Sequence, residues 1–543
     1  MKPDPNLPRG VQAFLFESAA RRRRAEETVV STLEKAGLSE VILPVLDFAR
    51  PYQGLGAGDS PLYQFVDRQG ELLSLRADFT PMAARVLAPR LGQLTLPIEF
   101  FYRGDVVRDE ESGVGRLREF SQAGAERYGD PRIEADERML TLLIAALGLP
   151  PDGFTVNLGY AGLLEKLLAA AAPSLTAGEG AKLLALVQAA RERRVTEVEA
   201  VLVHDGAKGA VAAEIGAALL SGFDLSSRLF SLPVLAEGAA ALRRAGETAR
   251  RALPGLEVVA DLAGTPEAPY YTGLTFSAVA RGVAAPLAAG GRYDLLLGRF
   301  GRPCAAVGFS VGIETLAAAQ EAIHESVKAP AQEAVRPLRI ACGKGRLLAK
   351  ALAALREAGV DFAEPDGRRL LFPDRSGRFE LLLLKDDDVP TYVAHGGADL
   401  GVVGSDRVAE SGENVFTPVS FPFGACRLAL IKKKGRPFAP NGHPVVVGTK
   451  YRRMARKYFD DRRIAHEIVP LAGSVELAAV LGLTDVVVDL IETGSTIAAN
   501  GLEEVETIFP SSATLIVGPA SLASRRSEIA SLVARLSGKA VAP

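Results

Sequence analysis

The residues best suited to chemistry follow a buried apolar run near the C-terminus. The stretch 486–491 contains Asp489 and leads into Glu492-Thr493-Gly494-Ser495-Thr496, after which an apolar pattern resumes at Ile497. This order predicts a strand, a loop and a helix start. Glycine permits close backbone approach, hydroxyls donate to phosphate oxygens, and free amides at a helix start favour an anion. The loop is predicted to hold a phosphate.

Two carboxylates in the same stretch narrow the choice of ligand. Asp489 and Glu492 repel a phosphate, but they can accept hydrogen bonds from sugar hydroxyls or share a magnesium ion. A phosphorylated ribose therefore fits better than a bare phosphate, and a phosphoribosyl donor is the natural hypothesis. The alternative is a tight strand-to-helix turn in which Thr493 and Ser495 only cap the helix.

Composition bounds the class of protein. With 543 residues, two to four domains are expected. The 63 basic and 65 acidic residues give a net charge of -2, which supplies no global field for nucleic acid or for an anionic membrane. Three cysteines and five histidines show no metal-ligand or disulfide spacing. Without a signal core or an apolar stretch near 18 residues, we expect a cytoplasmic protein with no membrane or nucleic-acid partner.

The two halves of the chain differ in pattern. Residues 1–318 are expected to form an α+β domain, with antiparallel strands at 98–103 and 273–279 and long helices around 161–172 and 181–200. A polar, alanine-rich linker is expected at 319–336. Residues 337–543 alternate strands and helices, which predicts largely parallel sheets covered by helices.

Five ordered motifs mark the first half. They are Leu75 to Thr80, Phe101 to Asp105, Arg118 to Glu126, Tyr270 to Gly273, and Gly290 to Asp294. Their polar residues suit an amino-acid pocket: carboxylates can accept from an α-ammonium and an imidazole, and tyrosine offers a ring wall with a polar tip. The alternative is that the carboxylates form structural ion pairs with Arg76, Arg103, Arg118 or Arg127.

Together these motifs resemble the class II histidyl-tRNA synthetase core over about residues 8–318. The resemblance implies an antiparallel-sheet domain that binds histidine, with these residues on histidine-contacting positions: Asp78, Thr80, Gln122, Glu126 and Tyr271. Two synthetase arginines are replaced, one by the segment 266–269 and one by Thr315. No anticodon-binding domain follows. Amino-acid activation is therefore expected to be absent, and the half is similar to the regulatory subunit of short-form ATP phosphoribosyltransferase, which senses histidine.

A second ordered set precedes the phosphate loop in residues 337–543. It comprises Lys344-Gly345-Arg346, Gly367 to Leu370, Asp388 to Val393, Ala398 to Gly404, and Gly473 to Leu477. This half resembles the short catalytic subunit of ATP phosphoribosyltransferase, with a two-lobed, periplasmic-binding-protein-like α/β fold. The implied reaction joins ATP and phosphoribosyl pyrophosphate to give phosphoribosyl-ATP and pyrophosphate, the first step of histidine biosynthesis. We expect a regulator and a catalyst fused in one chain.

The resemblance assigns roles to individual residues. Arg346 and Arg368 fall on arginines that approach both substrates. The phosphoribosyl pyrophosphate site comprises Asp489, Glu492, Thr493, Gly494, Ser495 and Thr496. The ATP site comprises Lys344, Gly345, Arg346, Arg368, Lys385, Gly473, Ser474 and Glu476. Magnesium is expected near Asp489 and Glu492, held mostly through substrate.

The chain departs from the family pattern at two places, and two other functions are compatible with parts of it. Cys342-Gly343 stands where the family has an apolar residue with proline or serine, and Lys385 where relatives often have arginine. A solute-binding protein and an active synthetase with an appended domain are the other hypotheses. For a fused enzyme we expect inhibition by histidine through the first half and a homo-oligomer, a dimer of dimers or larger.

Overall fold

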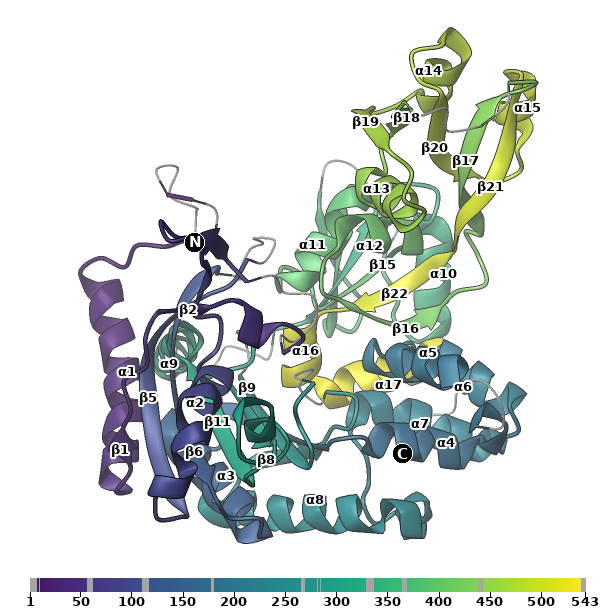
Figure 1. Ribbon diagram of the computed structural model, residues 1–543. Coiled ribbons are helices and arrows are strands. Elements are labelled where there is room, and N and C mark those ends of the chain that lie inside the picture. Colours follow the sequence, from purple (N-terminus) through teal and green to yellow (C-terminus); the bar gives the residue numbers. More distant parts are fainter. Residues whose placement is uncertain are drawn as a thin grey trace. The chain divides into compact units, whose positions relative to one another are not determined.

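The computed structural model describes the chain except for residues 1–6, 9, 56–61, 110–116, 177–179, 265–268, 281, 284, 329–335, 364–368, 437, 439–442 and 539–543. The chain forms two compact units. The first comprises Met1–Ala334 with Ala520–Ala530, and the second comprises Val335–Pro519 with Ser531–Pro543. Figure 1 follows the chain through both units in sequence colours.

The first unit contains an eight-stranded sheet in the order β1-β5-β6-β11-β10-β9-β7-β8 and a small sheet in the order β2-β4-β3. The strands are β1 Ser39–Glu40, β2 Leu46–Phe48, β3 Gln64–Val66, β4 Leu72–Leu75, β5 Ile98–Val107, β6 Glu119–Tyr128, β7 Phe154–Tyr160, β8 Glu257–Ala260, β9 Leu274–Ala280, β10 Ala288–Arg292 and β11 Ala306–Gly312. The helices are α1 Glu17–Lys35, α2 Phe79–Leu87, α3 Ile133–Leu147, α4 Leu163–Ala171, α5 Gly180–Arg191, α6 Val195–His204, α7 Gly209–Ser221, α8 Pro233–Ala252 and α9 Ile313–Lys328.

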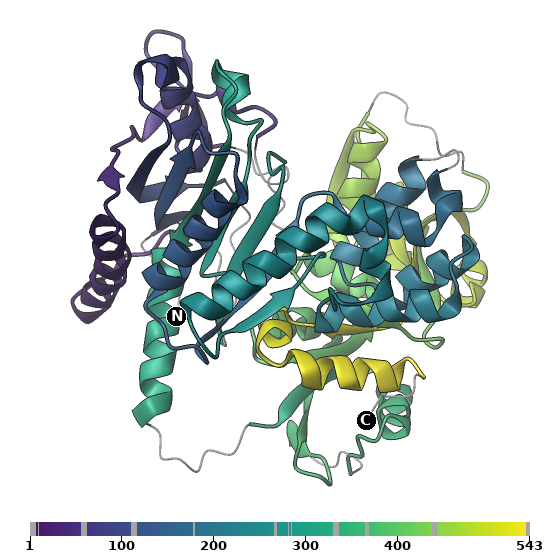
Figure 2. The ribbon, with the colours of Figure 1, turned by 90° about the horizontal axis from the view of Figure 1, so that it is seen from below.

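Helices α1, α3, α8 and α9 pack on the large sheet, as Figure 2 shows from below. Helix α1 buries Ala25, Val29 and Leu33, which recur every four residues. Of its basic run 21–24, Arg23 and Arg24 are exposed, whereas Arg22 is partly buried and donates to Glu314 at 2.8 Å. The predicted strands at 98–103 and 273–279 are confirmed as parts of β5 and β9, and both pair antiparallel with neighbours. Among the described strands of the first unit, only the edge pairs β1 with β5 and β7 with β8 are parallel.

One predicted helix of this unit is wrong. The alanine-rich stretch 181–200 is not continuous: α5 ends at Arg191 and α6 begins at Val195. Between them Arg193 takes a left-handed backbone conformation, with φ 54°. Neither glycine nor proline marks this break, so the helical pattern by itself gave no signal for it.

The second unit contains a six-stranded and a five-stranded sheet, each with its own helices. Subdomain A (residues 335–421 and 513–519) has the strands β12 Leu338–Gly343, β13 Leu371–Pro373, β14 Phe379–Leu384, β15 Leu400–Gly404, β16 Phe416–Ser420 and β22 Ala513–Val517, and the helices α10 Leu348–Glu357, α11 Val389–Ala394 and α12 Ser405–Ser411. Subdomain B (residues 426–511) has the strands β17 Cys426–Lys433, β18 Val445–Thr449, β19 His466–Pro470, β20 Val486–Ile491 and β21 Leu502–Ser511, and the helices α13 Arg452–Asp461, α14 Val475–Leu481 and α15 Ser495–Ala499. Two last helices follow, α16 Pro519–Ser524 and α17 Arg526–Leu536.

The sheet of subdomain B is buried on both faces, which explains its continuous apolar strands. Val486 and Val488 of β20 pack in one core with Tyr451 and Phe459, whereas Val487 packs in the opposite core, under α14. Successive side chains of a strand point to opposite faces, so a strand covered on both sides must be apolar throughout. The apolar run before the phosphate loop is therefore a central strand.

The expectation of largely parallel sheets is wrong for both subdomains. In subdomain A, β12 pairs parallel with β14 and β15, but β13, β22 and β16 are antiparallel. In subdomain B, β18 pairs parallel with β19 and β20, but β17 and β21 are antiparallel. The long strand β21 and the shorter β22, which follows it directly, carry the chain from one sheet to the other without a crossover helix, and a local pattern does not reveal this path.

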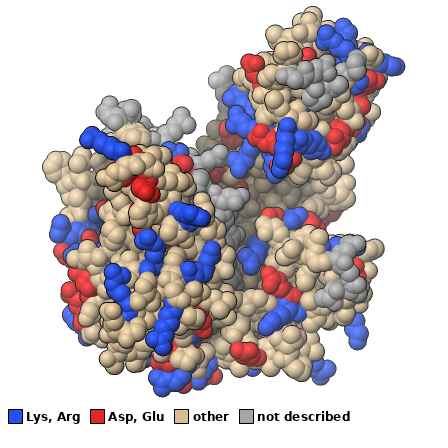
Figure 3. All heavy atoms as spheres, viewed as in Figure 1, with Lys and Arg blue, Asp and Glu red and all other residues tan. Residues whose placement is uncertain are grey.

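The surface carries no single dominant charge. On the face drawn in Figure 3, basic and acidic side chains are interspersed, in keeping with the net charge of -2. Among the described residues, every helix is too short or too polar to cross a bilayer.

Candidate active site and candidate amino-acid pocket

The carboxyl ends of parallel strands gather polar segments in subdomain A. Strands β12, β14 and β15 run in the same direction, and they are followed by Lys344 to Arg346, Lys385 to Asp388, and Ser405 to Arg407. Because parallel strands end at the same edge of a sheet, these three segments share that edge. One of them carries the predicted substrate arginine, Arg346.

Subdomain B repeats this arrangement. Its parallel strands β18, β19 and β20 are followed by Lys450-Tyr451, by Leu471 to Ser474, and by Glu492 to Thr496. The predicted phosphate loop therefore shares an edge with Gly473 and Ser474, which the sequence assigned to ATP. Ser474 has a left-handed backbone, with φ 49°, a conformation that is uncommon outside glycine and asparagine.

The two edges face each other. Arg346 of subdomain A forms an ion pair with Glu492 of the phosphate loop in subdomain B, and both side chains are exposed. Within subdomain B, Lys450 Nζ lies 3.6 Å from Asp489 Oδ1. Two segments that are almost 150 residues apart in sequence thus meet at one place, with cations and carboxylates from both subdomains.

The phosphate loop has the predicted strand, loop and helix order. Gly494, with φ 80°, precedes α15, and no side chain caps this helix from the N-cap position. Thr493 Oγ1 and Ser495 Oγ lie 3.0 Å apart, and the Ser495 amide donates to Thr493 Oγ1 at 3.5 Å, at the limit of a hydrogen bond. The loop hydroxyls are therefore exposed and only weakly engaged with the backbone.

Asp489 lies in a partly desolvated position beneath this loop. Burial raises the pKa of its carboxyl, and Glu476 adds to this effect, whereas Lys450 opposes it. Glu476 lies in the first turn of α14, so the structure brings a residue assigned to ATP within electrostatic range of the predicted ribose carboxylate.

In the first unit, four of the five predicted histidine contacts are linked by hydrogen bonds or ring contacts. Asp78 caps α2 by accepting from the Thr80 amide, and it accepts from Tyr270 Oη at 3.2 Å. Thr80 Oγ1 donates to Glu126 Oε1 at 2.7 Å. Tyr271 packs against Tyr270, with ring centroids 5.2 Å apart.

Gln122 is the fifth predicted contact, and its side-chain oxygen is an unsatisfied hydrogen-bond acceptor among the described residues. Gln122 Oε1 is buried without a hydrogen-bond partner among the described residues. A buried polar atom without a partner costs free energy, so its presence at a pocket suits a ligand that supplies the missing donor. Neither Asp78 nor Glu126 pairs with Arg76, Arg103 or Arg127, which engage other acceptors.

Glu126 is fully buried at the centre of this cluster. Besides Thr80, it accepts from Tyr293 Oη and, at 3.4 Å, from Tyr102 Oη. Burial raises the pKa of its carboxyl to about 8, although these donors oppose the shift. A side chain at Gly308, its partner across the sheet, is impossible because a Cβ there would lie 1.5 Å from Glu126 Oε2.

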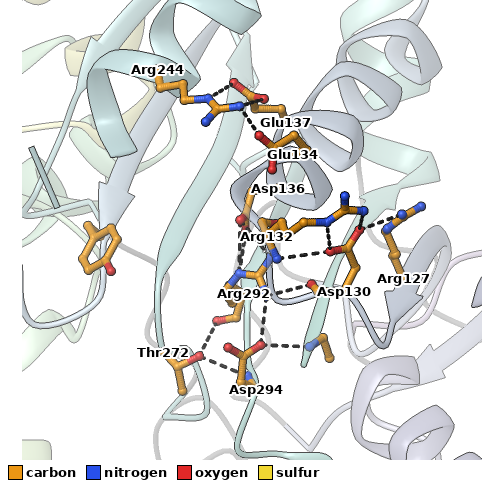
Figure 4. Close-up of polar contacts among 12 residues, drawn as sticks. Arg127, Asp130, Arg132, Glu134, Asp136, Glu137, Arg244, Thr272, Arg292 and Asp294 are labelled. Atoms are coloured by element: carbon orange, nitrogen blue, oxygen red, sulfur yellow. Dashed lines mark hydrogen bonds and ion pairs between the residues drawn. The ribbon is translucent and has the colours of Figure 1, made fainter. Parts of the chain in front are cut away.

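Tyr293 is held in place by a buried ion network that Figure 4 displays. Its neighbour Arg292 donates to Asp136 at 2.9 to 3.1 Å and to Asp294 at 3.1 Å. This arginine therefore orients the end of β10 and is not directed at a ligand. No residue of the motif 290–294 was predicted to contact histidine, but the structure brings Tyr293 into hydrogen-bond contact with Glu126.

Comparisons with known proteins match each unit to a family. The family model for histidyl-tRNA synthetase matches residues 10–316, more than half of the chain, and that for ATP phosphoribosyltransferase matches residues 385–538. The ATP phosphoribosyltransferase of Deinococcus radiodurans is 45% identical over 199 residues, which are 37% of this chain and 89% of the relative. That of Thermus thermophilus is 42% identical over 199 residues and 95% of its length.

The chain belongs to the histidyl-tRNA synthetase and ATP phosphoribosyltransferase families. A solved structure described as an ATP phosphoribosyltransferase regulatory subunit/histidyl-tRNA synthetase from Bacillus halodurans C supports the fold of the first unit. It has a TM-score of 0.51 at 23% identity and covers 70% of this chain and 94% of its own. The second unit is an ATP phosphoribosyltransferase, an enzyme of histidine biosynthesis.

At Cys342-Gly343, where the chain was expected to depart from the family pattern, the Asp386 carboxylate lies against the loop. A Cβ at Gly343 would lie 1.4 Å from Asp386 Oδ1, and one at Gly345 would lie 2.8 Å from Asp386 Oδ2. The Asp386 carboxylate therefore occupies space over the loop that a larger residue at 343 would need. Burial raises its pKa, and Arg407 and Arg346 act in the opposite direction.

Several residues at this site were missed by sequence reasoning. They are Asp386, Asp387, Asp406, Arg407, Lys450 and Tyr451. Each follows a parallel strand, and this shared position at the carboxyl ends was the signal that could have identified them. Of the predicted residues, Lys344 and Lys385 lie at the edge of subdomain A with exposed side chains, and Arg368 lies outside the described residues.

By resemblance to the synthetases, two positions are expected to lack an arginine that an active synthetase has. Thr315, at one of them, donates to the backbone oxygen of Gly312 at 2.9 Å. The other replacement falls on residues 266–268, which lie outside the described part, and on Pro269.

Proposed function

We propose that transfer takes place between the facing edges of subdomains A and B, and that histidine bound in the first unit inhibits it. The observation that carries the catalytic part is the ion pair between Arg346 and Glu492, which joins the two predicted substrate segments. We divide the chain into a regulatory domain at 1–318, a linker at 319–336 and a catalytic domain at 337–543. The two subdomains correspond to the lobes of a periplasmic-binding-protein-like fold.

In the reaction, adenine N1 of ATP attacks C1 of the phosphoribosyl group and pyrophosphate leaves. A triphosphate and a pyrophosphate must approach each other, so fixed cations are needed to offset their repulsion and the charge that develops on the leaving group. Arg346 and Arg368 supply those cations. Adenine N1 carries no proton that must be removed before attack, so alignment of the two substrates accounts for much of the acceleration, and no general base is required.

The donor is bound by subdomain B. Thr493, Ser495 and Thr496 donate to the ribose 5-phosphate, Gly494 allows close backbone approach, and Asp489 with Glu492 accepts from the ribose hydroxyls. ATP lies against Lys344, Gly345 and Lys385 from subdomain A and against Gly473, Ser474 and Glu476 from subdomain B. Lys385 provides a point charge where arginine would provide a planar fork.

Magnesium fits this site as a companion of the substrate phosphates. Among the described residues there is no group of three or more potential ligands, and Asp489 and Glu492 each already face a cation. Magnesium is commonly held by one or two carboxylates together with phosphate oxygens, and when bound it neutralises negative charge on the leaving group. These two carboxylates suit that mode and do not form an all-protein cage.

Histidine is the effector that suits the pocket of the first unit. Asp78 and Glu126 can accept from its ammonium and imidazole groups, and Tyr271 supplies a ring wall. The Gln122 oxygen has no hydrogen-bond partner in the part of the chain that the structure describes, so a histidine donor could supply one. Fusion makes the encounter of regulator and catalyst intramolecular, so inhibition should persist at dilutions that separate two subunits. We further propose a cytoplasmic enzyme that assembles as a dimer of dimers or larger.

The first experiment measures phosphoribosyl-ATP formation by the full chain with ATP, magnesium and phosphoribosyl pyrophosphate, with and without histidine. We expect activity that histidine suppresses. We also expect saturating substrates to weaken histidine binding by the same factor by which histidine weakens substrate binding. Activity without suppression would reject the sensor role alone. Charging of tRNA with histidine by the same preparation would reject the regulatory assignment of the first unit.

The phosphate loop gives a separate prediction. Thr493→Val keeps the shape of the side chain but removes its hydroxyl, and we expect the KM for phosphoribosyl pyrophosphate to rise about tenfold through loss of one hydrogen bond to a charged group. The matched control is Thr507→Val, because Thr507 donates to Glu504 on a strand outside the loop. Equal KM values for the two variants would show that Thr493 only shapes the turn.

A further inference from the structure

The contact between subdomains A and B contains a buried carboxylate that the reaction does not use. Asp406, in the first turn of α12, is 4% exposed and accepts from Tyr451 Oη of subdomain B at 2.8 Å. It also accepts from Ser511 Oγ at 2.7 Å, where the chain returns from β21 to β22. One carboxylate of subdomain A therefore binds both the opposite subdomain and the crossing strand.

Tyr451 is completely buried and lies between cations of the two subdomains. Arg407 of subdomain A lies 4.9 Å from its ring centroid, and Lys450 of subdomain B lies 5.2 Å from it. Arg407 in turn pairs with Asp387 at 2.6 Å. Burial, together with Asp406, raises the pKa of the Tyr451 hydroxyl, so it stays a neutral donor.

Tyr451 is connected by short hydrogen bonds to the strand that carries the phosphate loop. Its amide donates to Thr449 Oγ1 at 2.8 Å, and Thr449 Oγ1 donates to the Val488 carbonyl at 2.6 Å. Asp489 follows Val488 directly in β20. A displacement of Tyr451 relative to Asp406 is thus transmitted to Asp489 and to Lys450, its neighbour in sequence.

A second contact also joins α12 of subdomain A to the start of α13 in subdomain B. Helix α13 has no side-chain cap of its own, and its first amides are unsatisfied within the helix. Glu410 of α12 accepts from the Arg453 and Met454 amides at 3.0 Å each, so a carboxylate of subdomain A caps a helix of subdomain B. The contact between α12 and α13 therefore fixes both where the start of α13 lies on α12 and how α13 is oriented relative to it.

We infer that Asp406 and Tyr451 form a latch that fixes the angle between subdomains A and B and thereby aligns the donor loop with Arg346. They are positioning residues, because neither is placed in direct contact with the reacting atoms. The inference rests on the transferase activity of this unit. It predicts that breaking the latch spares binding of the donor, which is local to subdomain B, and slows transfer, which needs both subdomains.

The test compares Tyr451→Phe with Tyr458→Phe. Tyr458 lies on α13, the helix that Tyr451 precedes, and donates to Glu506 at 2.8 Å, but Tyr458 and Glu506 both belong to subdomain B. We expect Tyr451→Phe to lower kcat at least tenfold, with the Kd of phosphoribosyl pyrophosphate in the absence of ATP within about twofold of the parent. Tyr458→Phe should change neither kcat nor the Kd of phosphoribosyl pyrophosphate, and it should lower Tm by about as much as Tyr451→Phe does.

Two further variants keep the inference falsifiable if Tyr451→Phe folds poorly. Asp406→Asn and Glu410→Ala disturb the latch from subdomain A, and each should lower kcat with donor affinity retained. The double variant of Asp406→Asn with Tyr451→Phe should be no slower than the slower single variant, because both remove one interaction. Equal kcat for Tyr451→Phe and Tyr458→Phe, or a loss of donor affinity as large as the loss in kcat/KM, would overturn the latch.

Discussion

Replacing Arg346 by alanine is expected to lower kcat by about 1,000-fold, because a preorganised cation next to a developing pyrophosphate charge contributes about 3 to 4 kcal/mol. Arg346 lies at the carboxyl end of β12 and is the described arginine of subdomain A that reaches the phosphate loop through Glu492. Steady-state kinetics with both substrates saturating would measure the effect. The kcat of Arg346→Lys should lie between those of the parent and of Arg346→Ala, since lysine keeps the charge but lacks the planar guanidinium group.

The control for this variant is Arg356→Ala. Arg356 also belongs to subdomain A and pairs with Asp361 at 2.9 Å, but this pair is on the surface of α10, away from the site. Its loss should leave kcat within about twofold of the parent, as for most surface ion pairs. If Arg346 acted only by neutralising Glu492, adding Glu492→Gln to Arg346→Ala would restore activity, and we expect no such rescue.

The second large effect is expected in regulation. Glu126→Gln should raise the histidine concentration needed for half inhibition by about 100-fold, since it replaces a carboxyl group, which can ionise to pair with a cationic group of histidine, by an amide that cannot. Calorimetric titration of the full chain with histidine would measure affinity independently of activity. Glu237→Gln is the matched control, because Glu237 accepts from Tyr160 at 3.1 Å on the exposed surface. Equal histidine affinity in both variants would exclude Glu126 as a contact.

Glu126→Gln, which should weaken histidine binding, is expected to raise the stability of the folded protein, and this gain should depend on pH. The pKa of Glu126 is about 8 in the folded protein, above its ordinary value, so the folded state binds this proton more tightly than the unfolded chain. The stability gained from protonation is fully present below the ordinary pKa and is lost as the pH rises through about 8. Glu126→Gln removes this loss, so its Tm should exceed that of the parent most clearly at pH 8 and above. A Tm difference that does not change between pH 5 and pH 9 would contradict the raised pKa.

The sequence by itself determined the local features of the catalytic half. The run of valines before Asp489 required a strand buried on both faces, and Gly494 between hydroxyl residues required a turn into a helix. These features depend on neighbours within about ten residues, so their physical causes are contained in the local pattern. The two ordered sets of motifs were likewise sufficient to identify both families.

Only the tertiary structure decided which distant groups meet. Strand order and the return of the chain through β21 and β22 bring together Arg346 with Glu492 and Asp406 with Tyr451. The local sequence around each of these residues does not indicate which residue it contacts. The same holds for Glu126, whose raised pKa results from complete burial beside Tyr102 of β5 and Tyr293 at the end of β10. Electrostatics and desolvation depend on distance in space, and for that reason the sequence could name the chemistry but not the contacts that tune it.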